Sequence, residues 1–278
     1  MVSLPPRAFV NCKQLFEVDL SDNHLKEIPN DTFSACQRVL LSNNQLTWLE
    51  AGSFTQLGDS VEKLHIDGNS LSSLPSTILD GLIHLKFLHI GSNLLTALPE
   101  DIFQANNLLD YLDLSKNKLA SLPIVVFAGL ANLNYLLLSN NELSSLASGV
   151  FQGMIRLRIL KLDNNILTSL EASVFSENKM LTYVKLTENQ LFSIHQSTFA
   201  NGLLLYMIQL DSNQLSSLPG RLFMGLTNLI CLHCSHNHLT SLPTGIFNET
   251  TWLEEICIDH NTVRTLPVWF LCHAFSFK

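Results

Sequence analysis

Residues 122–143 read LPIVVFAGLANLNYLLLSNNEL, and their pattern of leucine, phenylalanine and asparagine recurs along the whole chain. From Asn69 onward the pattern repeats every 24 residues, and the two earlier gaps are 21 and 25 residues. A fixed period of this length predicts a solenoid, in which each repeat packs on its neighbours. The string Leu-x-x-Leu-x-Leu-x-x-Asn-x-Leu occurs eleven times and places its asparagine at Asn23, Asn44, Asn69, Asn93, Asn117, Asn141, Asn165, Asn189, Asn213, Asn237 and Asn261.

Each repeat is expected to contribute one short strand. Leucines alternate with other residues, as at Leu112 and Leu114, which is the period-two pattern of a half-buried strand. Strands that recur in one direction pair in parallel, about 4.8 Å apart. We therefore predict an α/β-class horseshoe with an eleven-strand parallel sheet on its concave face. The convex side should be irregular or hold short helices, and residues 1–278 should form one domain.

Three further columns explain how the convex return path is held. The asparagine amide offers donors and acceptors to backbone groups left unpaired at the turn. Leu-Pro, as at Leu122-Pro123, sets an extended turn after the strand. A phenylalanine follows most asparagines by ten residues and predicts a stacked spine, with Leu79 and Leu271 as substitutes. Its members are Phe9, Phe33, Phe54, Phe103, Phe127, Phe151, Phe175, Phe199, Phe223 and Phe247.

Composition narrows the function. Of the 278 residues, 46% are hydrophobic and 14% are charged, which is typical of a folded chain and not of a disordered one. The formal net charge is −8 and there is no basic run, so binding to nucleic acid is not expected. The longest late apolar run, 268–275, is far shorter than the roughly 20 residues that span a bilayer. We therefore expect no direct insertion of this segment into a membrane, and we recognise no signal peptide at the N-terminus.

The unit Leu-Pro-x-x-x-Phe-x-x-Leu-x-x-Leu-x-x-Leu-x-Leu-x-x-Asn-x-Leu resembles the 24-residue class of extracellular leucine-rich repeats. Toll-like receptors, small leucine-rich proteoglycans, Slit-type guidance proteins and variable lymphocyte receptors carry such repeats. The resemblance covers the chain from Leu4 to Leu266 and implies an extracellular or cell-surface recognition module, since one scaffold hosts many ligands. Neither end shows the clustered cysteines of the usual caps. We therefore expect a piece of a longer protein, or one whose last repeat is covered by 267–277.

The remaining motifs indicate no chemistry. Cys12, Cys36 and Cys234 replace core leucines and are expected to be buried thiols rather than parts of a disulfide framework. We found no phosphate-binding glycine loop, nucleophile elbow or metalloprotease helix, so no enzyme activity, catalytic residue or cofactor is expected. Four candidate metal ligands occupy equivalent positions on adjacent repeats. They lack a standard ligand spacing, so no metal site is predicted. Those candidates are His233, His236, Cys257 and His260.

The outward-facing strand positions predict a ligand site. Residues six and four before each asparagine should share the concave surface. The six-before column is apolar and aromatic over six consecutive repeats, about 24 Å at the strand spacing, and such a row flanked by polar groups is typical of a partner site. Tyrosine preference for strands is the competing explanation. The predicted ligand-binding residues are Phe87, Tyr111, Tyr135, Ile159, Tyr183 and Met207, with His89, Asp113, Lys161 and Lys185 beside them.

Two sequons, at Asn30 and Asn248, fall on the convex return path and favour secretion. The sequence thus predicts a secreted protein or receptor ectodomain that binds a protein, or else a glycan, on its concave face. Two other functions stay compatible with it: a structural protein of the extracellular matrix, and an intracellular scaffold.

Overall fold

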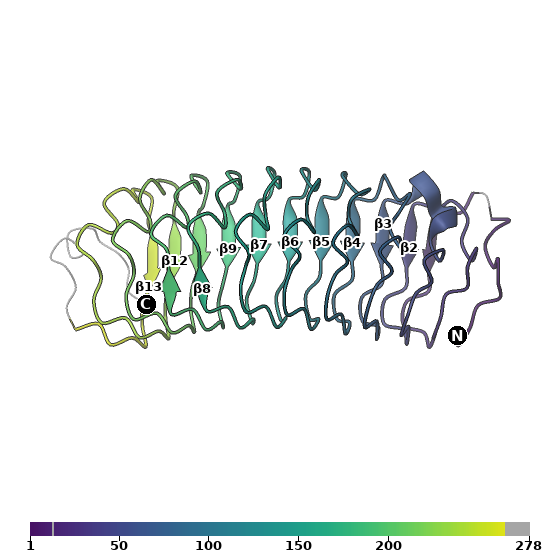
Figure 1. Ribbon diagram of the computed structural model, residues 1–278, viewed down its shortest axis with the longest axis horizontal. Coiled ribbons are helices and arrows are strands. Elements are labelled where there is room, and N and C mark those ends of the chain that lie inside the picture. Colours follow the sequence, from purple (N-terminus) through teal and green to yellow (C-terminus); the bar gives the residue numbers. More distant parts are fainter. Residues whose placement is uncertain (13, 265–278) are drawn as a thin grey trace.

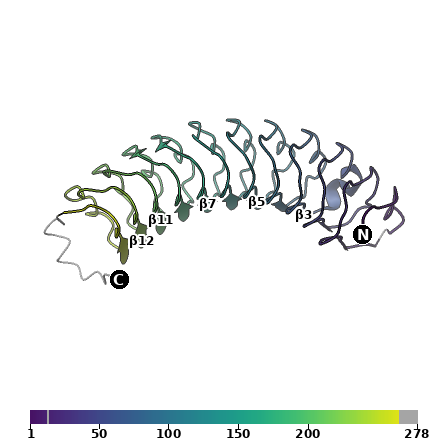
Figure 2. The same ribbon diagram turned by 90° about the horizontal axis from the view of Figure 1, so that it is seen from below.

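The computed structural model describes residues 1–12 and 14–264, which form a curved solenoid (Figure 1). Its main sheet has eleven strands, all paired in parallel and in chain order, as the repeat predicted. Figure 2 shows these strands along the inner edge of the arc, so they form its concave face. They are β1 (Glu17–Asp19), β2 (Arg38–Leu40), β3 (Lys63–His65), β4 (Phe87–His89), β5 (Tyr111–Asp113), β6 (Tyr135–Leu137), β7 (Ile159–Lys161), β9 (Tyr183–Lys185), β11 (Met207–Gln209), β12 (Cys231–His233) and β13 (Glu255–Cys257).

Each strand buries its middle residue and turns its two flanking residues toward the concave surface. In β5, Leu112 is fully buried, while Tyr111 and Asp113 are partly exposed. The register is uniform, so equivalent residues of successive repeats lie side by side, as Tyr111 does with Tyr135. Strand β13 differs, because its middle residue, Ile256, is only partly buried. The outward columns read from the sequence are therefore continuous rows on the surface.

The asparagine column forms the predicted hydrogen-bonded ladder. Asn141 Nδ2 donates to the carbonyl of Leu138 in its own repeat and to that of Leu114 in the preceding one, both at 3.1 Å. Its Oδ1 accepts the backbone N–H of Leu119 at 3.0 Å. Asn141 is buried, as are most members of the column. The ladder therefore supplies partners for backbone groups that water cannot reach.

A left-handed residue comes directly before each of these asparagines. The position has φ between 50° and 66° in all eleven repeats, although only Gly68 is a glycine. Lys116, Glu188 and His236 adopt it as well. This conformation is uncommon for side-chain-bearing residues. It turns the chain sharply out of each strand, and the buried asparagine that follows holds the turn in place.

The phenylalanine spine packs the convex return path. Neighbouring rings lie 5.7–6.2 Å apart between centroids, at angles of 7–31°. Phe127 and Phe151 are fully buried, and the whole column from Phe33 to Phe247 lies in one hydrophobic core. Leu79, which takes the place of a phenylalanine, is buried as well. The spine predicted from the sequence is confirmed.

A second, two-stranded sheet was not predicted. β8 (Ser169–Leu170) pairs in parallel with β10 (Ser193–Ile194) on the return path, where most repeats carry Leu-Pro. Here Glu171 and His195 replace the proline, and the His195 N–H donates to the Leu170 carbonyl at 2.9 Å. Proline has no N–H and could not make this bond. The absence of proline at position 195 thus permits this hydrogen bond between the two repeats.

The convex side is irregular, and the described residues contain one 3-10 helix, η1 (Thr55–Ser60). It lies in the 25-residue gap between Asn44 and Asn69, one residue longer than the standard repeat. Gly58 within it has φ 51°, a backbone conformation that glycine adopts without steric cost. The extra residue is therefore absorbed on the return path, and the sheet keeps its register.

The cysteine predictions are confirmed in two cases and wrong in one. Cys36 and Cys234 are buried free thiols, but Cys12 is an exposed one. Cys12 lies in the first repeat of the chain, where its side chain is exposed. The predictions for Leu271 and for a cover formed by 267–277 fall outside the described residues.

Candidate functional site

The predicted concave residues form one continuous row in the structure. We name it the concave stripe; it crosses β4 to β7, β9 and β11, whose register pairs each member with the next. Phe87 is 38% exposed and Tyr135 37% exposed, and the other members are half-buried. Large apolar side chains thus reach solvent over six consecutive repeats. The members of the stripe are Phe87, Tyr111, Tyr135, Ile159, Tyr183 and Met207.

Aromatic rings stack across the N-terminal half of this surface. The imidazoles of His65 and His89 lie 4.0 Å apart between centroids, and His89 stacks on Tyr111 at 4.7 Å. Tyr111 and Tyr135 follow at 5.8 Å in a tilted pair. Such contacts restrict each ring to a narrow range of positions. This end of the stripe is therefore a preorganised aromatic surface rather than a set of free side chains.

Both imidazoles in this stack are held neutral. Burial, followed by the positive charges of His89 and Lys63, lowers the pKa of His65 to about 4. Burial also lowers the pKa of His89, although Asp113 opposes the shift. His65 Nε2 is buried and has no hydrogen-bond partner among the described residues. At neutral pH this part of the concave face therefore carries no positive charge from its histidines.

In the middle of the concave face, a network of hydrogen bonds centred on Asp163 holds the polar side chains in place. Asp163 accepts hydrogen bonds from Ser139 Oγ at 2.6 Å and from Lys185 Nζ at 3.1 Å. Burial acts to raise the pKa of Asp163, but these bonds and the charge of Lys185 outweigh it, and the pKa is lowered. Lys185 is therefore committed to an internal ion pair. Of the two predicted lysines, Lys161 has no ion pair among the described residues, so its charge is available to a ligand.

Tyr183, the most C-terminal tyrosine of the stripe, is held by its neighbours. Its hydroxyl donates to Gln209 Oε1 at 2.5 Å. Burial and the nearby charge of Asp163 raise its pKa to about 12. Asp113, also predicted at the site, accepts from the backbone N–H and the hydroxyl of Ser115 and is thereby fixed at the strand end. Both residues face the concave surface in defined orientations.

The C-terminal end of the concave face carries a polar cluster of different character. His233, Glu255 and Cys257 place one nitrogen, oxygen or sulfur each within 4.8 Å of one another. The repeat spacing predicted that His233 and Cys257 occupy equivalent positions on adjacent repeats. It did not predict that Glu255 lies beside them. Burial, then the Glu255 carboxylate, raises the pKa of Cys257 to about 11 and raises that of Cys231. Both residues are therefore thiols at neutral pH in this structure.

A second group of possible ligands lies at the adjacent turn. His236, Asp259 and His260 also bring their polar atoms within 4.8 Å of one another, and all three are exposed. The two imidazoles stack at 4.0 Å, and His260 Nδ1 lies 2.6 Å from Asp259 Oδ2. This group contains no sulfur. The four residues weighed from the sequence thus divide between two separate clusters.

The two sequons lie where the repeat placed them. Asn30 and Asn248 are exposed and belong to return segments rather than strands. Their threonines are buried, and the hydroxyls of Thr32 and Thr250 donate to the backbone carbonyls of Pro29 and Phe247. A sugar on either asparagine would extend away from the concave stripe.

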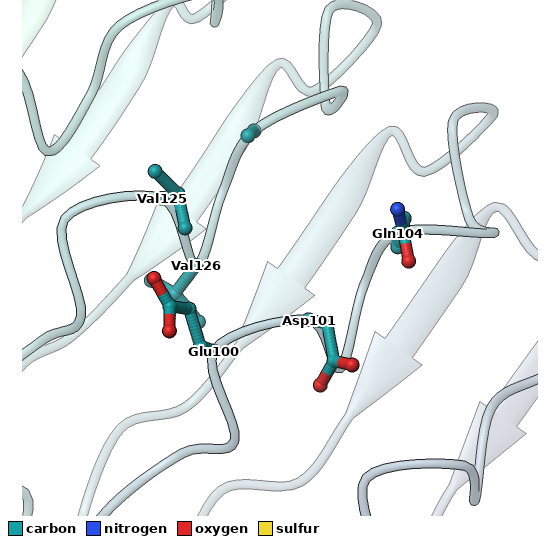
Figure 3. Close-up of a pocket in the computed structure, with 6 residues that line it drawn as sticks. Glu100, Asp101, Gln104, Val125 and Val126 are labelled. Carbon is teal, nitrogen blue, oxygen red and sulfur yellow. The ribbon is translucent and has the colours of Figure 1, made fainter.

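A hollow of about 410 Å³ opens on the return path (Figure 3). Glu100, Asp101 and Gln104 of one repeat line it together with Val125, Val126 and Ala128 of the next. It contains none of the predicted site residues. Its charged groups are two carboxylates, and no histidine, cysteine, serine or lysine lines it that could act with them as nucleophile, base or metal ligand.

Sequence comparison identifies the repeat. The family described as leucine rich repeat matches residues 59–119, 83–143, 107–167, 131–191, 179–239 and 203–263. The chain belongs to the leucine-rich-repeat family. No helix among residues 1–12 and 14–264 is long and apolar enough to cross a bilayer.

Individual relatives place this leucine-rich-repeat chain beside receptor proteins. It is 36% identical over 78 residues to the leucine-rich repeat-containing G-protein coupled receptor 5 of Rattus norvegicus, which covers 27% of this chain and 8% of that protein. The structure resembles Toll in the Drosophila Toll–Spatzle complex, with a TM-score of 0.89 and 25% identity over 99% of this chain and 38% of Toll. It also resembles a leucine-rich-repeat protein of Leptospira interrogans, with a TM-score of 0.84 and 28% identity. That match covers 96% of this chain and 66% of the Leptospira chain. The chain thus spans a small part of the first two proteins.

Proposed function

We propose that this leucine-rich-repeat chain is a non-enzymatic recognition module that binds a protein ligand through the concave stripe. The observation that carries the proposal is the row of partly exposed Phe, Tyr, Ile and Met side chains across β4 to β11. Monomeric proteins seldom expose contiguous apolar rows of this kind without a partner. Aromatic anchors with a polar border are what interface centres consist of.

The geometry supports protein over glycan as the ligand. The stack from His65 to Tyr135 is rigid and apolar, and its imidazoles are neutral, so binding there would bury aromatic surface rather than satisfy many hydroxyls. Lys161 adds one unpaired positive charge beside the stripe, which would attract an acidic group on the partner. The similar fold of Toll occurs in a complex with the protein Spatzle, which agrees with this choice.

An extracellular or cell-surface location belongs to the same proposal. The similarity to a G-protein coupled receptor and the exposed positions of Asn30 and Asn248 support it. When the chain is expressed through a secretory pathway, both asparagines should gain sugar, and mass spectrometry of the folded product measures their occupancy. A folded, secreted product with both sites unmodified would contradict this location. A matrix protein or an intracellular scaffold would then become the better assignment.

The binding site is tested with two matched triple variants. Ectodomains displayed on cells are selected with the wild-type chain, and each selected binder is then measured against Tyr111→Ala/Tyr135→Ala/Tyr183→Ala. The control is Ile124→Ala/Ile155→Ala/Leu203→Ala, which removes three exposed apolar side chains outside the strands. We expect the tyrosine variant to lose about 2 kcal/mol or more, roughly 30-fold in Kd, while the control stays near wild type.

Two outcomes would contradict binding at the concave stripe. Equal affinity of the wild type and the tyrosine variant would overturn the concave assignment. Loss of affinity in the control variant alone would move the site to the convex surface. Circular dichroism of both variants establishes that they are folded before their affinities are compared.

A further inference from the structure

Four side chains capable of binding a metal converge on the concave face at β12 and β13. The strand register sets Cys231 beside Glu255 and His233 beside Cys257. Residues two apart on one strand face the same side, and adjacent strands lie about 4.8 Å apart. The uniform repeat therefore directs a nitrogen, a carboxylate and two sulfurs toward one small region. No other place on the described part of the chain combines these ligand types.

The separations between these atoms match those of a zinc site. His233 Nε2 lies 3.7 Å from Glu255 Oε1, and Cys257 Sγ lies 3.6 Å from the same oxygen. Tetrahedral zinc with ordinary bond lengths to nitrogen, oxygen and sulfur places neighbouring ligand atoms about 3.3–3.6 Å apart. The two separations to Glu255 Oε1 are close to these values, and all three ligand atoms lie within 4.8 Å of one another.

The imidazole has a nitrogen free for such an ion. His233 Nε2 is buried and has no hydrogen-bond partner among the described residues. On the other side of the ring, Nδ1 lies 3.9 Å from Asp211 Oδ2 and 3.3 Å from Gln209 Nε2. A proton on Nδ1 directed toward Asp211 leaves the Nε2 lone pair for the metal. This tautomer requires the Gln209 amide to turn, so that its oxygen faces Nδ1 and its nitrogen donates to the Tyr183 hydroxyl, which then accepts instead of donating. A carboxylate behind a metal-binding histidine is a common arrangement in zinc proteins.

We propose that His233, Glu255 and Cys257 bind Zn²⁺, with water in the fourth position. Binding forms a zinc–sulfur bond, breaks the S–H bond of Cys257 and releases that proton to solvent. The thiolate and the carboxylate then balance the two positive charges of the ion. The thiolate favours zinc over magnesium or calcium, which prefer oxygen ligands.

Cys231 supports the site from outside the metal's own ligands. Its Sγ lies 3.7 Å from Glu255 Oε2, the carboxylate oxygen that faces away from Cys257, and it donates to that oxygen. Carboxylates that bind metals are ordinarily held by such hydrogen bonds. Cys231 is therefore a positioning residue, and its loss should weaken zinc binding without removing the sulfur ligand.

The site would join the last two described repeats. Ile256 in β13 is partly buried, whereas the middle residues of the other ten strands are buried. A metal shared by β12 and β13 would link the two strands through their side chains. Zinc should consequently slow hydrogen exchange of the β13 amides and leave β4 to β9 unchanged.

The test uses the full chain, reduced and freed of metal with a chelator. Zinc affinity is measured by calorimetry, and Co²⁺ serves as a spectroscopic probe because a thiolate ligand produces charge-transfer absorption in the near ultraviolet. We expect one zinc per chain and a sulfur-to-cobalt band. Cys257→Ser should abolish the band, and His233→Ala should weaken binding about 100-fold or more, beyond the loss typical of outer partners.

Matched controls distinguish this site from its neighbours. His236→Ala/His260→Ala removes the exposed histidine pair, and Cys272→Ser/His273→Ala removes candidate ligands outside the described residues; both should retain the band. Cys231→Ser should keep the band with weaker affinity. A band that survives Cys257→Ser, or that disappears with either control pair, would overturn the proposal. Circular dichroism of each metal-free variant separates loss of a ligand from loss of fold.

Discussion

Two rows of aromatic rings run along this solenoid, one inside the core and one on the concave surface. The phenylalanine spine has centroids 5.7–6.2 Å apart and is buried almost throughout. The tyrosines Tyr111 and Tyr135 have a similar spacing, 5.8 Å, yet they remain partly exposed on the concave face. The same period places both rows. Their surroundings differ, because the return path covers the phenylalanine row, whereas the tyrosine row stays partly exposed among the described residues.

This difference separates stability from recognition. Burying a phenylalanine removes its apolar surface from water and stabilises the fold by about 1.5–3 kcal/mol. A tyrosine left half-exposed yields only part of that gain in the free protein, and the remainder becomes available when a partner covers it. Substitutions in the two rows should therefore affect different measurements.

The largest effect on stability is expected in the buried row. Phe127→Ala removes a fully buried ring stacked between Phe103 and Phe151 and leaves a cavity that the neighbouring repeats cannot fill. We expect a loss of about 3–5 kcal/mol in the free energy of unfolding, measured by denaturant titration. A loss under about 1 kcal/mol would mean that the spine is not the main packing element.

A smaller, pH-dependent effect is expected from His65 in the concave face. Its pKa is lowered to about 4 in the folded chain from about 6.5 in the unfolded chain, so the unfolded state binds more protons between these values. The stabilisation is present above pH 6.5 and is lost as the pH falls through 4. Because the ring is about half exposed, we expect it to amount to about 1 kcal/mol after solvent screening. In His65→Gln the unfolding free energy should fall less between pH 7 and pH 5 than in the wild type; equal slopes would contradict this role.

The smallest effect on stability is expected at Tyr135. This residue is 37% exposed and contacts Tyr111 across a pair of neighbouring strands. A cross-strand pair contributes about 0.2–1 kcal/mol, so Tyr135→Ala should lower the unfolding free energy by no more than about 1 kcal/mol. A loss comparable to that of Phe127→Ala, in the same denaturant titration, would erase the distinction between the two rows.

Much of the fold could be predicted because it depends on residues that repeat. The alternation around Leu112 and Leu114 predicted the strands, and the columns through Asn141 and Phe127 predicted the ladder and the spine. Each of these features arises from contacts between equivalent positions, so one repeat predicts the rest. The concave rows could be assigned for the same reason.

What could not be predicted depends on departures from the repeat or on particular side-chain conformations. β8 pairs with β10 where Glu171 and His195 replace proline. The sequence shows these replacements, but it does not show that they lead to a second sheet. The ion pair between Lys185 and Asp163 links different columns, and so does the approach of Glu255 to His233. Cys12 is exposed although it occupies a core column position. The place of a residue within the repeat does not predict such contacts between different columns.

The most direct test of the concave assignment uses photo-crosslinking. Tyr135, or as the comparison Ile155 on the return path, is replaced by p-benzoylphenylalanine, and each chain is irradiated in the presence of a binder selected with the wild type. Both positions are exposed, so either can reach a bound protein that lies over it. We predict a covalent complex from position 135 and none from position 155. A complex that forms from position 155 and not from 135 would contradict recognition by the concave stripe.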